Sequence, residues 1–245
     1  MKTRILCLFL SILFLLTLTA CGDTPEATTS NYYRIPGEAK EEQGFTITSK
    51  KYTYKKRDYL LLDMENQTDK NYTVTVTVRY YNAEGKELRN QKQVFTGWAA
   101  GWQNYFLFQS NITFDSYTYT VELKDYAGEC YMQDYIALSS IKVKKIRATP
   151  LAAQKDYTKY PVISAEIETE VKGSQALTIS GRYVIFDKNG EIYLIDKAGS
   201  HFRNPGKDYT SITLYYDIEV EELVLPEELD GEINAIFVVS SIKPQ

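Results

Sequence analysis

The stretch Tyr72-Thr-Val-Thr-Val-Thr-Val-Arg-Tyr80 decides the fold of this chain. Every even position in it is apolar and every odd position is threonine or arginine, the period-two pattern of a β-strand with one buried face. An Asn-Ala-Glu-Gly turn follows at residues 82–85, and a return strand begins soon after it. The sequence therefore predicts an antiparallel β-hairpin over residues 72–94.

A second hairpin of the same kind lies further along the chain. Gly85 and Gly101 of the first copy align with Gly190 and Gly206 of the second at one constant offset. The strand at residues 177–185 keeps the inward phase, and each copy closes on Ser-Ser-Ile-Lys, at residues 139–142 and 240–243. Shared glycines, strand phase and ending together indicate an internal duplication.

Short alternating segments separated by Gly, Asn and Asp turns are typical of an antiparallel β-sandwich of immunoglobulin type. We therefore predict an all-β fold of two tandem immunoglobulin-like sandwich domains, at residues 45–147 and 161–245, joined by a linker at 148–160. The strand candidates of the first unit are 45–48, 52–54, 59–65, 72–81, 87–95, 104–108, 117–123 and 135–144. Those of the second unit are 162–171, 177–186, 192–195, 209–216, 219–225 and 233–242.

The N-terminus carries an export signal. Lys2 and Arg4 precede an apolar run at residues 5–18, which ends in small residues before Cys21. A charged start, a short apolar core and a small-residue cleavage site are typical of a secretory signal peptide, here residues 1–20. A membrane-spanning helix needs about 20 apolar residues.

The tetrapeptide Leu18-Thr-Ala-Cys21 resembles the lipobox of bacterial lipoproteins. The resemblance implies cleavage before Cys21, a diacylglyceryl group on its thiol, and acylation, as with palmitate, of the new amino terminus. The mature chain would then be anchored by lipid to the outer face of the bacterial cytoplasmic membrane, at the cell surface. The alternative is an ordinary secretory signal with a chance cysteine.

The segment after the signal is polar and lacks apolar periodicity. Residues 21–44 are rich in Thr, Ser, Glu, Ala, Pro and Gly, which is typical of a flexible tether. Lys2 and Arg4 leave with the signal, so 28 basic residues become 26 against 32 acidic ones. An acidic chain without a basic stripe argues against a nucleic-acid partner.

Residues that could support catalysis, a metal or a cofactor are scarce. His201 is the single histidine, and one histidine without cysteine or histidine neighbours does not build a typical zinc site. Phosphate-binding glycine loops and nucleophile elbows are absent from the sequence. Cys130 has no histidine nearby to activate it and is best interpreted as a small half-buried residue. We expect no enzyme activity, no catalytic or metal residues and no cofactor.

The two tryptophans lie in one connection. Trp98 and Trp102 flank Ala-Ala-Gly, and Tyr105 follows, whereas the second copy has Arg-Asn-Pro-Gly-Lys at residues 203–207. Large rigid aromatic faces suit contact with a protein partner or a glycan. Trp98, Trp102 and Tyr105 are therefore the candidate contact residues. In the alternative interpretation the two indoles close the open end of the core.

The chain resembles FxLYD-type domains of bacterial envelope lipoproteins in the segment Arg79-Tyr-Tyr-Asn-Ala-Glu-Gly85, which is followed by Gly101 before an apolar strand. The second copy has Val184-Ile-Phe-Asp-Lys-Asn-Gly190 in a similar place. The resemblance implies small sandwiches displayed outside the membrane, without enzyme activity, and it carries over no binding residue.

Three functions remain open at this point. The first is a membrane-anchored, non-enzymatic module that binds an envelope protein or glycan. The second is a structural spacer of the cell envelope. The third is a glycan hydrolase that uses a pair of carboxylates.

Overall fold

Strand β4 (Tyr72–Tyr81) forms where the alternating pattern predicts it. Val74, Val76, Val78 and Tyr80 are fully buried, while the residues between them are at least partly exposed. Burying a side chain of this size contributes about 1.5–3 kcal/mol, so the four even positions fix which face of the strand turns inward. A shift of one residue would move all four to the other face.

The structure, a computed structural model, describes residues 33–137, 146–149, 162–215 and 234–245. Several predicted features lie outside these residues: the signal peptide, Cys21, the first half of the tether, the Ser-Ser-Ile-Lys ending at 139–142, most of the linker at 148–160 and the strand candidate at 219–225. Within the described residues no α-helix occurs, and no helix there is long and apolar enough to cross a membrane.

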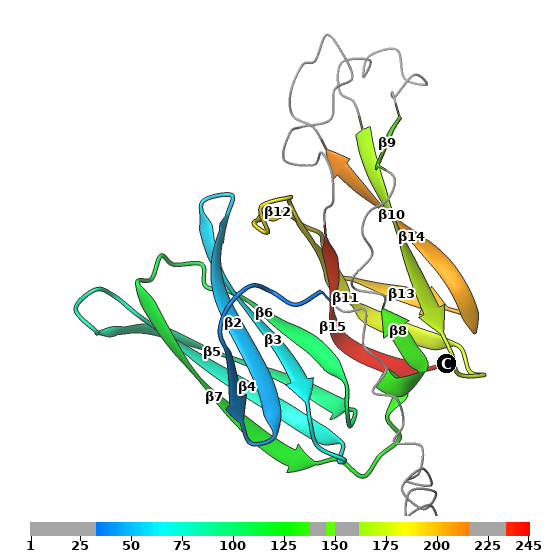
Figure 1. The fold of residues 1–245 in the computed structure, drawn as a ribbon, viewed down its shortest axis with the longest axis horizontal. Helices are drawn as coiled ribbons and strands as arrows, with labels where there is room; N and C mark the ends of the chain where they lie inside the picture. The colour runs from blue at the N-terminus through cyan, green and yellow to red at the C-terminus, as the bar shows by residue number, and fades with distance from the viewer. Residues whose placement is uncertain (1–32, 138–145, 150–161, 216–233) are drawn as a thin grey trace, which may run out of the picture. The chain divides into compact units, whose positions relative to one another are not determined.

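The described chain is all-β, and its strands pair antiparallel in four sheets (Figure 1). The strands of the first half besides β4 are β1 (Ala39–Glu42), β2 (Phe45–Tyr54), β3 (Arg57–Asn66), β5 (Glu87–Trp98), β6 (Gln103–Gln109) and β7 (Ser116–Asp125). A 3₁₀ turn η1 (Tyr131–Asp134) leads into the short strand β8 (Tyr135–Ala137), which pairs with a strand of the second half. Those that follow are β9 (Ile146–Thr149), β10 (Val162–Val171), β11 (Leu177–Phe186), β12 (Ile192–Ile195), β13 (Gly199–Arg203), β14 (Gly206–Tyr215) and β15 (Ala235–Pro244).

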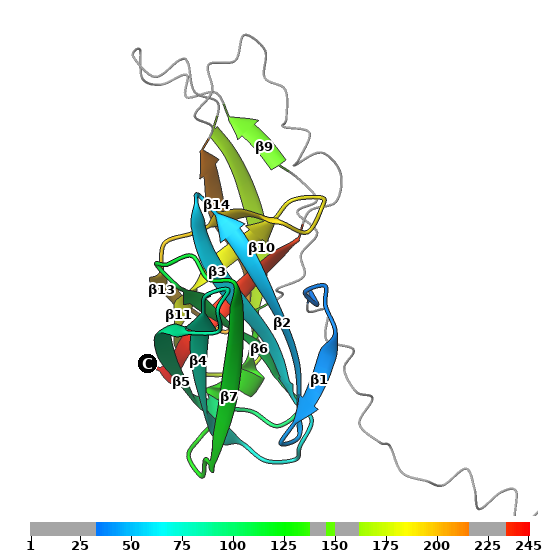
Figure 2. The ribbon, with the colours of Figure 1, turned by 90° about the vertical axis from the view of Figure 1, so that its left-hand side faces the viewer.

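The same pairing scheme occurs in both halves of the chain. In the first half β3 lies between β2 and β6, and β4 lies between β5 and β7 (Figure 2). In the second half β10 lies between β14 and the short strands β8 and β9, and β11 lies between β15 and the pair β12 and β13. Each half therefore contains two sheets, as a sandwich requires.

The two hairpin turns share their hydrogen bonds as well. The Asn82 amide donates to Lys86 O at 3.1 Å, and the Asp187 amide donates to Glu191 O at 2.9 Å. Gly85 and Gly190 both have positive φ, 77° and 74°, a conformation that glycine adopts without a steric penalty. Gly85 and Gly190, which align in the sequence, thus occupy the same position in two turns of the same kind.

The sheet that contains β3 and β6 is buried on both faces. Leu60 and Leu62 pack into the sandwich core with β4, while Leu61 and Leu107 point the other way. That second face packs against residues of β11, β12 and β15, and the cluster is Tyr52, Tyr59, Leu61, Tyr105, Leu107, Val184, Phe186, Ile192, Ile236 and Val238, with Ile35 from the N-terminal segment. Residues of both halves therefore share one buried layer.

The predicted tether is too long at its C-terminal end. Ile35 is buried in that shared layer, Arg34 is ion-paired with Asp63 at 3.3 Å, and β1 pairs with β2. The polar composition of β1, Ala-Lys-Glu-Glu, gives no sign that it is folded. β1 joins the edge of the sheet through main-chain pairing with β2, and it therefore needs no apolar face. Residues 33–44 belong to the folded part.

Other differences from the prediction are local. The candidates at 45–48 and 52–54 form one strand, β2. Strands β1, β9 and β13 were not predicted, because each is short and without clear alternation.

Candidate functional site

The structure places Trp98 in the core and not on an exposed edge. Its side chain has 0% exposure, and its ring lies 5.6 Å from Phe45, 5.5 Å from Phe95 and 5.7 Å from Phe106. The indole N–H donates to Trp102 O at 2.9 Å, so the polar edge of the ring is satisfied inside the protein. Trp98 therefore offers no ring face to a partner.

Tyr105 is also buried, but in a different layer. It is 1% exposed, and its hydroxyl donates to Tyr33 O at 2.6 Å, so its side chain points to the face of β6 opposite to Phe106. Trp102 is half-buried against the core. The three predicted contact residues thus do not form one exposed aromatic surface, because alternation along β6 sends Tyr105 away from the tryptophans.

A buried polar cluster lies next to Tyr105. Gln103 donates to Asp63 and to the Tyr105 hydroxyl, and the Ile35 amide donates to Asp63. Burial raises the pKa of Asp63 to about 6, against the opposing effect of the Arg34 guanidinium. The cluster holds the N-terminal segment at residues 33–35 against β3 and β6.

His201 and Cys130, the other residues considered for chemistry, make packing and hydrogen-bond contacts within the fold. His201 packs edge-on against Tyr183 and Phe237, and burial lowers its pKa. The Cys130 thiol donates to Gly97 O at 2.6 Å. No group of three or more His, Cys, Asp or Glu side chains in the described part of the chain is arranged to hold a metal ion.

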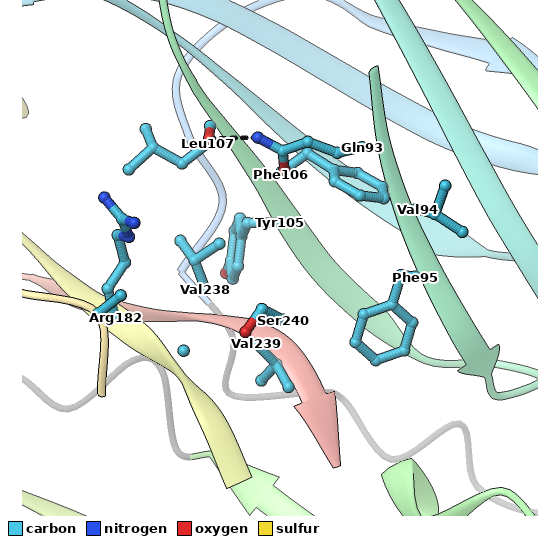
Figure 3. A pocket seen from close by; sticks show the side chains of 12 residues that line it. Gln93, Val94, Phe95, Tyr105, Phe106, Leu107, Arg182, Val238, Val239 and Ser240 are labelled. Carbon is cyan, nitrogen blue, oxygen red and sulfur yellow. Dashed lines mark hydrogen bonds between the residues drawn. The ribbon is translucent and has the colours of Figure 1, made fainter. Parts of the chain in front are cut away.

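A groove runs between the edges of three sheets. It consists of two adjoining hollows of about 310 and 400 Å³, which share Val94, Phe95 and Ser240 in their walls. Strand β5 forms one wall, β15 forms the other, and β6 contributes residues 105–107 (Figure 3). We call this the edge groove: residues 93–97 of β5, 105–107 of β6 and 238–244 of β15, with Tyr126, Glu129 and Tyr131 at one end.

Side chains from β5 cover the edge of β6 up to the start of the groove. Gln91 donates to Gln109 O at 2.8 Å, Gln93 donates to Leu107 O at 2.9 Å, and Arg89 donates to Ser110 O at 3.3 Å. Because β5 alternates, the next inward residue is Phe95, which has no donor. The cover therefore ends at Gln93, where the groove begins (Figure 3).

A second amide covers one position on β15. The buried Asn104 side chain donates to Val239 O at 3.0 Å and accepts from the Val239 amide at 3.2 Å. It thereby completes the main-chain bonds that a neighbouring strand would otherwise make. Asn104 also ties β6 to β15 at Val239, which lines the first hollow of the groove.

The walls of the groove combine apolar and basic side chains. Val94 is 52% exposed, and it is one of three exposed large hydrophobic residues in the described chain. Arg182 lines the first hollow and Lys243 lines the second, and neither makes an ion pair within the described residues. Glu129, the acidic side chain of the second hollow, accepts from the Tyr131 hydroxyl.

The groove was not predicted from the sequence, because the prediction of a contact surface rested on aromatic residues. The available signal was polar: Arg89, Gln91 and Gln93 occupy the inward positions of β5, where an apolar residue is expected. Polar side chains at inward positions of an edge strand indicate that the neighbouring sheet edge needs hydrogen-bond partners.

No protein-family model matches the chain, and no curated protein sequence does either. Among solved structures it is similar to a putative β-galactosidase from Bacteroides fragilis, with 12% identity and a TM-score of 0.24, over 89% of this chain and 34% of that one. A β-glucuronidase of glycoside hydrolase family 2 gives 10% identity and a TM-score of 0.22, over 91% of this chain and 26% of that one.

A tandem CBM22 domain of Xyn10C from Paenibacillus barcinonensis gives 8% identity and a TM-score of 0.16, over 85% of this chain and 93% of that one. The chain spans about a third, 34%, of the length of the β-galactosidase. At these TM-scores the similarities carry no argument about activity.

Proposed function

We propose that this chain is a lipid-anchored, extracytoplasmic protein with no enzyme activity, which binds an envelope partner through the edge groove. Cys21 carries the lipid, and the two duplicated halves are immunoglobulin-like, FxLYD-type sandwiches. The signal and the lipobox tetrapeptide support the anchor. More than one acyl chain is needed for stable attachment, which acylation of both the thiol and the amino terminus would supply.

One observation carries the binding function: the edge of β6 is covered by Arg89, Gln91 and Gln93, and the cover stops where the groove starts. Exposed sheet edges are a hazard that proteins normally protect. A gap in this protection, beside an exposed Val94 and two cations, favours a surface kept open for a partner.

The anchor is tested by metabolic labelling of the full chain with a palmitate analogue. We expect label on the wild-type protein and its loss in Cys21→Ser. Cys7→Ser is the matched control and should keep the label, because Cys7 leaves with the signal. Label that persists in Cys21→Ser would contradict the anchor.

The binding function is tested by capture from solubilised envelope extract with the full-length protein. The double variant Arg182→Glu and Lys243→Glu should lose the captured material. The control Lys56→Glu and Lys86→Glu makes the same charge change at exposed turn residues outside the groove and should retain it. Equal capture by both variants would contradict a role of the groove, and no capture by wild type would favour a spacer.

A further inference from the structure

The main chain of β5 presents hydrogen-bonding groups to the edge groove. Strand β4 directs its odd residues toward β7, since Tyr81 O accepts from Asp115 N and Asn71 O accepts from Tyr126 N. Its even residues therefore face β5, and Val74 and Val76 are paired with Phe95 and Gln93. The main-chain N–H and C=O groups of Lys92, Val94 and Thr96 consequently point away from β4.

These outward groups have no partner among the described residues. The hydrogen bonds of the described chain include none to the main chain of Val94 outside its own sheet. This series of outward main-chain groups ends at Gly97, whose carbonyl accepts a hydrogen bond from the Cys130 thiol. The open edge thus runs along the β5 wall of the groove at Val94 and Thr96.

Strand β15 limits the groove on the other side. Val239 has its outward groups bonded to Asn104. The Gln245 amide donates to Ala176 O, so Gln245, Lys243 and Ser241 direct their main chain toward β11. Ile242 then faces outward, and Pro244, the next outward residue, has no N–H to offer. The β15 edge is therefore interrupted at Val239 and at Pro244, on both sides of Ile242, which favours β5 as the edge that accepts a strand.

The side chains of the groove indicate what such a strand would carry. Phe95, Phe106 and Val239 are buried at the base, where apolar side chains fit. Arg182 and Lys243 line the walls, in a chain whose formal net charge is −4. A strand that alternates apolar and acidic residues would place its apolar side chains inward and its carboxylates beside the two cations.

We propose that the edge groove binds an extended peptide segment, which adds to strand β5 as a further strand and presents acidic side chains to Arg182 and Lys243. This inference rests on the proposed binding function and names the chemistry of the partner. Main-chain bonds to residues 92–96 supply affinity, and the cations supply selectivity. A glycan is less well suited, because Trp98 is buried and the Tyr126 and Tyr131 hydroxyls are bonded to Glu129.

The test is fluorescence polarisation with the full-length protein in detergent micelles and a labelled pentapeptide of alternating glutamate and valine, the length of the β5 wall of the groove. We expect saturable binding, about tenfold or more stronger than that of the same peptide with lysine in place of glutamate. N-methylation of alternate main-chain nitrogens should weaken binding at least about tenfold, because it removes the donors of a β-ladder.

Two proline variants localise the effect. Val94→Pro removes an outward N–H in the groove and should weaken binding by about tenfold. Asn90→Pro is the matched control, since it makes the same change at an outward residue of β5 that does not line the groove. It should leave the affinity unchanged, and an unchanged thermal midpoint in both variants shows that the fold is kept.

Equal binding of the acidic, basic and N-methylated peptides, or no saturable binding of the acidic one, would overturn strand addition. A soluble cell-wall glycan that binds and is lost in Arg182→Glu would overturn it too, while the proposed binding function would stand. Failure of both probes, together with failed capture from envelope extract, would remove the binding function itself.

Discussion

Strands β4 and β11 open equivalent hairpins, yet they lie in different surroundings. On β4 the odd residues remain partly or fully exposed. On β11 the odd residues from Leu177 to Ile185 are buried, as the even residues of β4 are. Val184 and Phe186, on the opposite face of β11, are buried as well. The alternating pattern therefore identifies the buried face that the two strands have in common. The second face depends on the neighbouring sheet, and the hairpin pattern carries no information about it.

The connections that follow the two hairpins also differ in how their side chains are packed. Trp98 in the first half aligns with Arg203 in the second at the offset that matches Gly85 with Gly190. Trp98 fills the centre of an aromatic cluster, whereas Arg203 forms an ion pair with Asp208 at 3.3 Å. The aligned position after the hairpin thus holds an indole in one half and a guanidinium in the other.

The largest effect should come from Trp98→Ala. Removing a fully buried indole from contact with three phenylalanine rings should lower the free energy of unfolding by about 4 kcal/mol. The aligned change Arg203→Ala should cost about 1 kcal/mol or less, because Asp208 is more than half exposed. Urea unfolding measures both, and similar losses would show that Trp98 and Arg203 do not differ in their contribution to the fold.

The second prediction concerns the extra buried face of β11. Phe186→Ala should lower the free energy of unfolding by about 3 kcal/mol, because Phe186 packs with Tyr33 and Tyr52. The aligned variant Tyr81→Ala removes a half-exposed ring of β4 and should cost about 1 kcal/mol or less. If Tyr81→Ala proves as costly, the two strands do not differ in the way described.

The third prediction tests the polar cluster on the doubly buried sheet. Asp63 has a folded pKa of about 6, above its ordinary value of 3.8, so the folded state binds the additional proton between these values. Stability from this group is present below about pH 4 and is lost as the pH rises through about 6, on the order of 2 kcal/mol. Stability measured from pH 4 to 7 should show this decline, and Asp63→Asn should remove it. A decline that persists in the variant would assign it to another group.

The fourth prediction concerns the tie between β6 and β15. Asn104→Ala should cost about 2 kcal/mol, because it leaves the buried Val239 N–H and C=O without partners. Gln109→Ala is the control, since its side chain bonds Asn111 at the exposed end of the same strand. Chemical unfolding of both variants checks the difference, and an equal effect would argue that Asn104 is not needed.

The smallest effect should come from the exposed ion pair Lys50 and Glu191, which links β2 to the second hairpin turn at 2.9 Å. Lys50→Ala should change the free energy of unfolding by less than about 0.5 kcal/mol, because water and salt screen the pair. A loss above about 1 kcal/mol would show that this contact, and not the buried layer, holds the two hairpins together.

Alternation alone predicted the central strands and their inward phase, because burial of a full side chain outweighs other local preferences. The second buried face was harder to foresee. The continuous run Leu60-Leu61-Leu62 on β3 was its one sequence signal, and such a run is typical of a strand covered on both sides. The prediction of an exposed aromatic edge failed because Trp98 and Tyr105 lie on strands whose facing depends on tertiary packing, and sequence spacing does not supply that.

The most direct test of the edge groove is amide hydrogen exchange in the protein without ligand. If β5 is an open edge, the Val94 N–H points away from β4 and exchanges much faster than the Phe95 N–H, which faces Val74. We expect this contrast within β5, and protection of the Val94 N–H once the alternating acidic peptide is added. Equal protection of Val94 and Phe95 in the unliganded protein would show that the edge is already covered, and would contradict this expectation.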